Sequence, residues 1–268
     1  MSRFDLSGET AVVIGATGVL GGRIAVGLAE AGASAAILGR REEAGMERVR
    51  EIESAGGKAA FVFCDATNPE SVRESREKAT ALLGEPTILV NAAGGNRPEA
   101  TVTQENPFEE VDTDEWNAVM TLNYCGGVYY PCREYGAAMV RAGRGSVVNI
   151  ASVAAHIPLS RVAAYSSAKA AVLSLTQFLA REWASKGVRV NSITPGFFPA
   201  EQNRRLLYNE DGTPTERAAQ ILGHTPAGRF GNPDELVGAA VFLASEKASS
   251  FVTGADIRVD GGFLATTI

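Results

Sequence analysis

Cysteine is scarce in this protein of 268 residues, which contains only Cys64, Cys125 and Cys132. None of them forms a C-x-x-C pair, so the sequence predicts neither a disulfide framework nor a zinc site. We expect the three thiols to be small buried side chains and the protein to hold no metal. A reducing cytoplasm is the compartment that fits this cysteine usage best.

Long apolar runs and an excess of positive charge are also missing. No apolar stretch approaches the roughly 20 residues of a membrane-spanning helix, and the polar first eight residues lack the core of a signal peptide. The net charge is -6, which argues against nucleic acid or an anionic membrane as the main partner. A small molecule is therefore the expected ligand.

Short apolar runs alternate with longer amphipathic segments along the sequence. The runs are apolar almost throughout, which is typical of strands buried on both faces of a parallel sheet. Strands are predicted over 11–14, 35–38, 59–63, 88–90, 146–150, 188–193 and 257–259, and helices over 22–31, 42–55, 69–83, 114–140, 163–186 and 233–243. Asn68 and Asn232 are predicted N-caps, and Asp112 with Glu115 resembles a capping box.

This alternation predicts one α/β domain over residues 1–268, a Rossmann-type doubly wound parallel sheet flanked by helices. The length also suits a single domain. Residues 197–231 break the alternation and are too long for an ordinary connection. We expect a small substrate lid or a helical excursion there.

A glycine-rich turn, GATGVLGG over residues 15–22, follows the first predicted strand and opens the first helix. Glycine lets the backbone approach a pyrophosphate, toward which the free N–H groups of the helix start then point. The turn predicts nucleotide contacts from Gly15, Thr17, Gly18, Val19, Leu20 and Gly21. The alternative is a tight turn that only packs the helix on the strand.

The end of the second predicted strand bears on which nicotinamide cofactor binds. An acidic residue there would hydrogen-bond the adenosine ribose and repel a 2′-phosphate. This sequence has Gly39 followed by Arg40 and Arg41, and a guanidinium pairs well with phosphate. We therefore favour NADP(H) over NAD(H), the alternative being that both arginines are merely solvated at a helix start.

Tyr165 and Lys169 are four residues apart on a predicted helix and so share one face. Ser152 follows the strand ending at Ile150, where parallel strands line a ligand crevice. Ketone reduction needs a hydride and a proton, and we expect the nearby ammonium to lower the tyrosine pKa toward the working range. Ser152 could hydrogen-bond the substrate oxygen. By itself, Y-x-x-x-K also occurs as a surface pair.

Together these motifs resemble the active site of the short-chain dehydrogenase/reductase family. The resemblance spans about residues 5–263 and includes the motifs NAAG at 91–94 and VDGG at 259–262. It implies Asn123 as a fourth catalytic member that holds a water, and Asn191 beside the nicotinamide. It also implies cofactor contacts from Asp65, Ala66, Asn91, Ala92, Ala93, Gly94, Tyr165, Lys169, Pro195, Gly196 and Phe198, and a homotetramer. Ile14 and Val19 depart from the family's usual threonine and middle glycine.

Residues 94–110 and 196–204 are similar to one branch of this family, the D-mannonate oxidoreductases, also called fructuronate reductases. That resemblance implies interconversion of a keto sugar acid and its hydroxy acid. Asn96, Gln202 and Asn203 suit sugar hydroxyls, and Arg97 or Arg204 could hold the carboxylate.

Other functions stay open at this stage. Phe197, Phe198 and His156 would suit a more apolar ketone or would pack the lid, and His156 is not expected to be catalytic. A gluconate 5-dehydrogenase-like or 3-oxoacyl reductase-like carbonyl reductase is a second reading. A catalytically silent nucleotide-binding scaffold is a third, which the intact set of Ser152, Tyr165 and Lys169 disfavours.

Overall fold

A computed structural model of the protein describes residues 2–200 and 204–267. Its centre is a seven-stranded sheet in the order β3-β2-β1-β4-β5-β6-β7, in which all neighbours are parallel. The strands are β1 (Thr10–Ile14), β2 (Ser34–Gly39), β3 (Ala59–Phe63), β4 (Ile88–Asn91), β5 (Gly145–Ile150), β6 (Val188–Pro195) and β7 (Asp256–Val259). The predicted doubly wound parallel sheet is confirmed.

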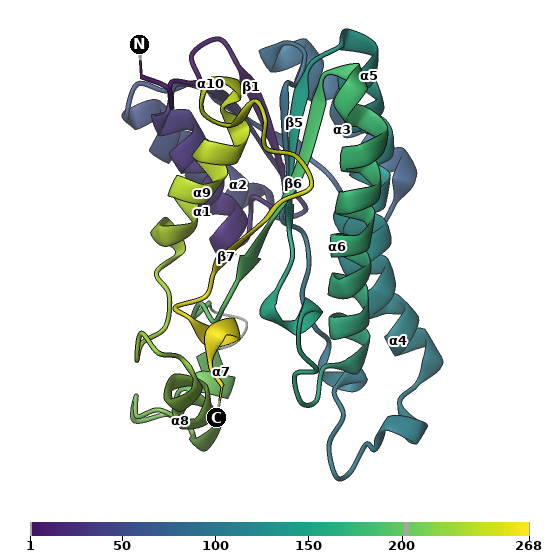
Figure 1. Cartoon of the computed structure of the whole chain (residues 1–268), viewed down its shortest axis with the longest axis vertical. Helices are drawn as coiled ribbons and strands as arrows, with labels where there is room; N and C mark the ends of the chain where they lie inside the picture. Colours follow the sequence, from purple (N-terminus) through teal and green to yellow (C-terminus); the bar gives the residue numbers. More distant parts are fainter. Residues whose placement is uncertain (1, 201–203, 268) are drawn as a thin grey trace.

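Helices cover both faces of this sheet (Figure 1). The α-helices are α1 (Val19–Glu30), α2 (Glu42–Ser54), α3 (Pro69–Leu83), α4 (Thr113–Met120), α5 (Ala137–Ala142), α6 (Ala163–Trp183), α7 (Arg204–Leu207), α8 (Glu216–His224), α9 (Val237–Ala244) and α10 (Glu246–Ser249). One apolar core joins α1, α2 and α9 to the sheet, and a second joins α3, α5 and α6 to the opposite face. Within the described ranges, no helix is both long and apolar enough to span a membrane.

The prediction of one continuous α-helix over 114–140 is wrong, because part of this segment is π-helical. After α4 the polypeptide runs through two π-helical stretches, η3 (Thr121–Tyr129) and η4 (Cys132–Gly136), before α5. Pro131, between the stretches, has no N–H to donate along the helix. A Cβ on Gly126 would lie 2.4 Å from the carbonyl oxygen of Ala66, so this wide turn is pressed against the loop that follows β3.

The predicted helix caps are largely confirmed. The Asn68 side chain accepts from two backbone N–H groups of α3, and Asn232 forms a full capping box with Glu235. Asp112 also caps α4, but the capping box expected with Glu115 is wrong. The Glu115 carboxylate instead binds the guanidinium of Arg97, with 2.6 Å between Oε2 and Nε.

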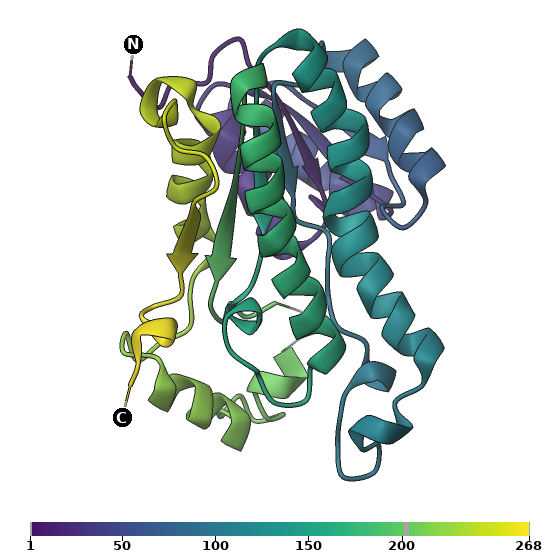
Figure 2. The ribbon, with the colours of Figure 1, turned by 45° about the vertical axis from the view of Figure 1, so that its right-hand side comes forward.

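The described residues within 197–231 form a helical unit around α7 and α8, as the break in the alternation of strands and helices predicts. The unit has a small apolar core of its own, made of Leu207, Ala218 and Ile221 with the rings of Phe197, Tyr208 and Phe230 packed against it. Figure 2 shows the unit beyond the arrowheads of β6 and β7, at the carboxyl edge of the sheet.

Candidate active site

The strand order reverses between β1 and β4, which places the crevice of a doubly wound sheet at their carboxyl ends. The glycine-rich turn and the NAAG segment meet there. A Cβ on Gly15, whose φ is +84°, would lie 2.7 Å from the backbone nitrogen of Ala93. A Cβ on Gly21 would lie 2.6 Å from the carbonyl oxygen of Gly15. Glycine at both positions is therefore required by close backbone contact.

The start of α1 is suited to an anion. Its N-cap is Gly18, and among the described residues no side chain caps the helix. Its first turn carries no acidic residue, so no carboxylate of that turn competes for the N–H groups of Val19, Leu20 and Gly21, which the helix leaves without an internal partner. These residues fit the pyrophosphate of a dinucleotide, although Ile14 and Val19 depart from the usual loop pattern.

Beyond the turn lie the residues predicted to contact the adenosine end of the cofactor. The guanidinium of Arg41 donates a hydrogen bond to the carbonyl oxygen of Thr17. Arg40 is exposed and has no hydrogen-bond or ion-pair partner in the part of the protein that the structure describes. Asp65 accepts from the backbone N–H and hydroxyl of Thr67 through one oxygen, at 3.0 Å and 2.7 Å.

Ser152, Tyr165 and Lys169 come together beyond the end of β5. Ser152 is buried and accepts from the backbone N–H of Ala154 at 3.1 Å, and the half-buried Tyr165 belongs to the same group. Lys169 is buried beneath them, and its Nζ donates to the carbonyl oxygen of Ile150 at 2.8 Å. The same Nζ lies 5.7 Å from the centroid of the Tyr165 ring.

Asn123 joins this group from the π-helical stretch η3. Its Oδ1 accepts from the Gly95 N–H at 2.9 Å, and its Nδ2 donates to the Gly95 carbonyl at 2.7 Å and to the Val119 carbonyl at 2.9 Å. A Cβ on Gly94 would lie 2.6 Å from Asn123 Oδ1 and 3.3 Å from Lys169 Nζ. All four predicted catalytic residues therefore lie in one place, next to the NAAG segment.

Burial dominates the electrostatics of this site. It lowers the pKa of Lys169 to about 8, because the ammonium loses hydration. Burial also raises the pKa of Tyr165, and the polar influence of the nearby Ser152 hydroxyl opposes this rise only in part. The predicted lowering of the tyrosine pKa by the lysine is wrong for the protein alone. The ammonium lies over the ring and donates to Ile150 instead of to the phenol oxygen.

In three of the residues expected to contact the cofactor or to lie beside the nicotinamide, the side chain packs or hydrogen-bonds within the protein. Asn91 is buried and donates to Asn149 Oδ1 at 2.8 Å, which ties β4 to β5. Asn191, expected beside the nicotinamide, binds the Val252 carbonyl and the Ala255 N–H and so fixes the approach to β7. The Phe198 ring is buried in the main core, where a Cβ on Gly231 would come within 2.3 Å of it.

Ala66, Pro195 and Gly196 occupy the predicted edge of the sheet. Ala66 is buried in the loop after β3, and Pro195 ends β6. Gly196 donates its N–H to the Val259 carbonyl at 2.9 Å, and a Cβ on it would lie 2.8 Å from Cα of Asp260. This close packing holds the turn after β6 against the VDGG motif.

The predicted substrate residues are only partly available. Arg97 is neutralised by Glu115, and Asn96 donates to the hydroxyl of Thr101 at 3.0 Å. Gln202 and Asn203 lie outside the described residues, and Arg204 begins α7. His156 has a structural contact, since its Nε2 lies 3.1 Å from Asp256 Oδ2.

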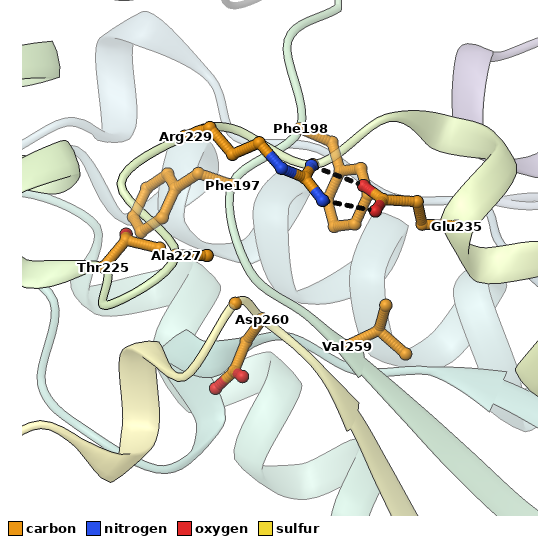
Figure 3. A pocket seen from close by; sticks show the side chains of 10 residues that line it. Phe197, Phe198, Thr225, Ala227, Arg229, Glu235, Val259 and Asp260 are labelled. Atoms are coloured by element: carbon orange, nitrogen blue, oxygen red, sulfur yellow. Dashed lines mark hydrogen bonds and ion pairs between the residues drawn. The ribbon is translucent and has the colours of Figure 1, made fainter.

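A separate cavity of about 80 Å³ lies between the 197–231 unit and β7 (Figure 3). Its lining includes the rings of Phe197 and Phe198, and its rim holds Arg229 paired with Glu235 through two bonds of 2.8 Å and 2.6 Å. None of the predicted catalytic residues lines it. The cavity was not predicted from the sequence, and the two charges at its rim pair with each other.

Comparisons with known proteins agree with this geometry. The family model described as enoyl-(acyl carrier protein) reductase matches residues 15–264. Gluconate 5-dehydrogenase of Gluconobacter oxydans is 36% identical over 97% of this chain and 96% of its own length. A Haemophilus influenzae crystal structure with bound NAD, provisionally assigned as a D-mannonate oxidoreductase, has a TM-score of 0.91 at 37% identity and covers 98% of this chain and 97% of its own.

A further solved structure combines a coenzyme with a small acid. It is a gluconate 5-dehydrogenase from Burkholderia cenocepacia in complex with NADP and tartrate. Its TM-score to this protein is 0.89 at 35% identity, and the match covers 99% of this chain and 98% of the other. The similarity therefore extends over the whole described fold, including the 197–231 unit.

Proposed function

Because the protein belongs to the short-chain dehydrogenase/reductase family, it is a nicotinamide-dependent oxidoreductase acting on CH–OH groups, and we propose that its substrate is a keto sugar acid of the fructuronate type. The reaction interconverts a ketone and a secondary alcohol. In the reductive direction, the ketone, the reduced coenzyme and one proton give the alcohol and the oxidised coenzyme. The coenzyme, when bound, supplies or accepts the hydride.

The protein's own residues hold the substrate oxygen and move the proton. Tyr165 is the proton donor, and its raised pKa keeps the phenol protonated near neutral pH for delivery to the forming alkoxide. The Ser152 hydroxyl accepts from the Ala154 N–H, which leaves its own proton to donate to the substrate oxygen as negative charge develops there. Lys169 places a cationic side chain beneath the phenol.

The observation that carries this proposal is the convergence of Ser152, Tyr165, Lys169 and Asn123 at the carboxyl edge of the sheet. We further propose NADP(H) as the preferred coenzyme, with Arg40 meeting the 2′-phosphate and the N-terminal turn of α1 holding the pyrophosphate. We also propose that residues 1–268 act as one catalytic domain, that 197–231 closes over the substrate, and that the protein is a homotetramer.

A gluconate 5-dehydrogenase activity is the second candidate. The gluconate 5-dehydrogenase relatives in sequence and structure favour it. In both candidates the ketone belongs to a six-carbon acid, so one panel separates them. Turnover is measured with fructuronate, 5-ketogluconate and an acyl-thioester ketone, each with NADH and NADPH.

Each candidate function predicts a different preferred substrate in this panel. The proposal predicts the highest kcat/KM with fructuronate and NADPH. A preference for 5-ketogluconate would replace the proposed substrate with that of the second candidate. Turnover of the thioester alone would contradict both sugar-acid assignments.

A further inference from the structure

Two arginines that the sequence-based prediction did not use, Arg161 and Arg217, lie near each other at the start of α6. Arg161 lies in the loop that leads into α6, one residue before its N-cap Val162. Arg217 lies on α8 of the 197–231 unit, with its Nη1 3.5 Å from the hydroxyl of Ser160. Arg217 therefore reaches from the proposed lid to the loop that carries Arg161, an approach that Figure 2 shows between α8 and the start of α6.

Within residues 2–200 and 204–267, neither Arg161 nor Arg217 forms an ion pair, whereas Arg97 and Arg229 are each matched by a glutamate. Burial lowers the pKa of Arg217, and the charge of Arg161 lowers it further. Because Arg217 is half-buried and the two like charges repel each other, an anion between them would be stabilised.

The backbone at Arg161 gives a second and independent reason to assign it a role. Its φ is +75°, the only positive value at a non-glycine among the described residues. The conformation is held by the Val102 N–H, which donates to the Arg161 carbonyl at 2.9 Å. A side chain as large as arginine adopts this region at a cost, and such strain gathers where function needs it.

The position suits one end of a six-carbon acid. Arg161 precedes Tyr165 by four residues, in the loop that leads into α6, so both residues lie at the N-terminal end of this helix. In fructuronate and in 5-ketogluconate, four carbon–carbon bonds separate the keto carbon from the carboxylate carbon, about 5 Å when extended. A substrate whose ketone meets Tyr165 can therefore present its carboxylate to the two arginines.

We propose that Arg161 and Arg217 bind the carboxylate of the substrate between the α6 loop and α8, and thereby select sugar acids over neutral ketoses. The inference rests on the proposed function and assigns the recognition group within it. A guanidinium fork matches a carboxylate, and a pair of them would also draw α8 onto the site once the acid is bound.

The test compares two variants with a matched control. Arg161→Asn keeps a residue that tolerates positive φ, Arg217→Gln removes the second charge, and Arg181→Gln removes a charge from the exposed part of α6. With a carboxylate-bearing ketone, 5-ketogluconate or fructuronate, both site variants should raise KM about tenfold or more at a nearly unchanged kcat. KM for the neutral ketose fructose and the Kd of NADPH should stay within about threefold, as in the control.

A binding measurement keeps the inference separate from the proposed function. Calorimetric titration of gluconate into the full-length protein saturated with NADPH should show binding that both site variants weaken about tenfold and the control does not. If no ketone is turned over but this pattern holds, the proposed reaction fails and the carboxylate site stands. Equal KM changes for acid and neutral ketones, or unchanged gluconate affinity in both site variants, would overturn the inference.

Discussion

At the scale of single residues, burial of the Lys169 ammonium in the proposed active site lowers the stability of the folded protein. Lys169 has a pKa of about 8 in the folded protein, against about 10.4 when unfolded. Below pH 8 the folded state therefore holds an unfavourable buried charge. Between the two values the unfolded state binds more protons, so the free energy of unfolding rises with pH.

Lys169→Met should accordingly be more stable than the parent protein and inactive. At pH 7 we expect a gain of about 2 kcal/mol, allowing for the lost hydrogen bond to the Ile150 carbonyl. The gain should shrink toward zero as pH rises from about 8 to about 10.5. Urea unfolding at pH 7 and pH 10 measures it, and a variant that is less stable at pH 7 would show that the ammonium is well solvated.

Arg40 is the residue on which the coenzyme preference depends. Arg40→Asp replaces a free guanidinium with a charge that repels a 2′-phosphate, so the Kd of NADPH should rise about tenfold to a hundredfold. The Kd of NADH should change by less than about threefold. Arg50→Asp, with the same charge change at an exposed position of α2, is the control. Unchanged NADPH affinity in Arg40→Asp would contradict the preference.

Which residues can be predicted from sequence depends on whether local spacing decides their role. Tyr165 and Lys169 are four residues apart on a helix, and this spacing alone brings them together. Whether an arginine is free depends on tertiary contacts instead. Arg97, which was predicted with Arg204 as an alternative to hold a carboxylate, is neutralised by Glu115. Arg161 and Arg217 form no ion pair within the described residues, and no local sequence pattern pointed to them.

At the scale of elements, the strands were predictable and the winding of one helix was not. The short apolar runs locate the strands well: β3 matches its predicted range and the others differ by one or two residues. The π-helical stretch η3 arises from contacts with the loops after β3 and β4, which a helical period does not reveal. That winding sets Asn123 against Gly95.

Gly126→Ala tests the role of this wide turn. Its Cβ would press on the Ala66 carbonyl, and we expect a loss of about 1–3 kcal/mol with weaker coenzyme binding, since Ala66 belongs to the predicted adenosine loop. Gly238→Ala is the control. It lies in helix α9 with nothing within 4 Å of the added carbon and should gain about 0.5–1 kcal/mol. Thermal unfolding with and without NADPH compares them, and equal stability of the two variants would contradict the close contact.

At the scale of the whole molecule, the arrangement of strands assembles the site. The order β3-β2-β1-β4-β5-β6-β7 brings the ends of β1, β4 and β5 to one edge, so residues far apart in sequence meet. The fold class followed from the alternation of strands and helices, whereas Asn123 was predicted only through the family resemblance. The arrangement of the 197–231 unit could not be predicted from the sequence. No alternation of strands and helices constrains it, and the residues of its small core come together only through tertiary contacts.

Tyr165→Phe tests the central claim most directly, because it removes the phenol oxygen and little else. Turnover of a keto sugar acid and the Kd of NADPH are measured on the same preparation of variant and parent. The account predicts a fall in kcat of about a hundredfold to ten-thousandfold with a Kd within about threefold of the parent. A variant that keeps the turnover of the parent would contradict the assignment of Tyr165 as the proton donor.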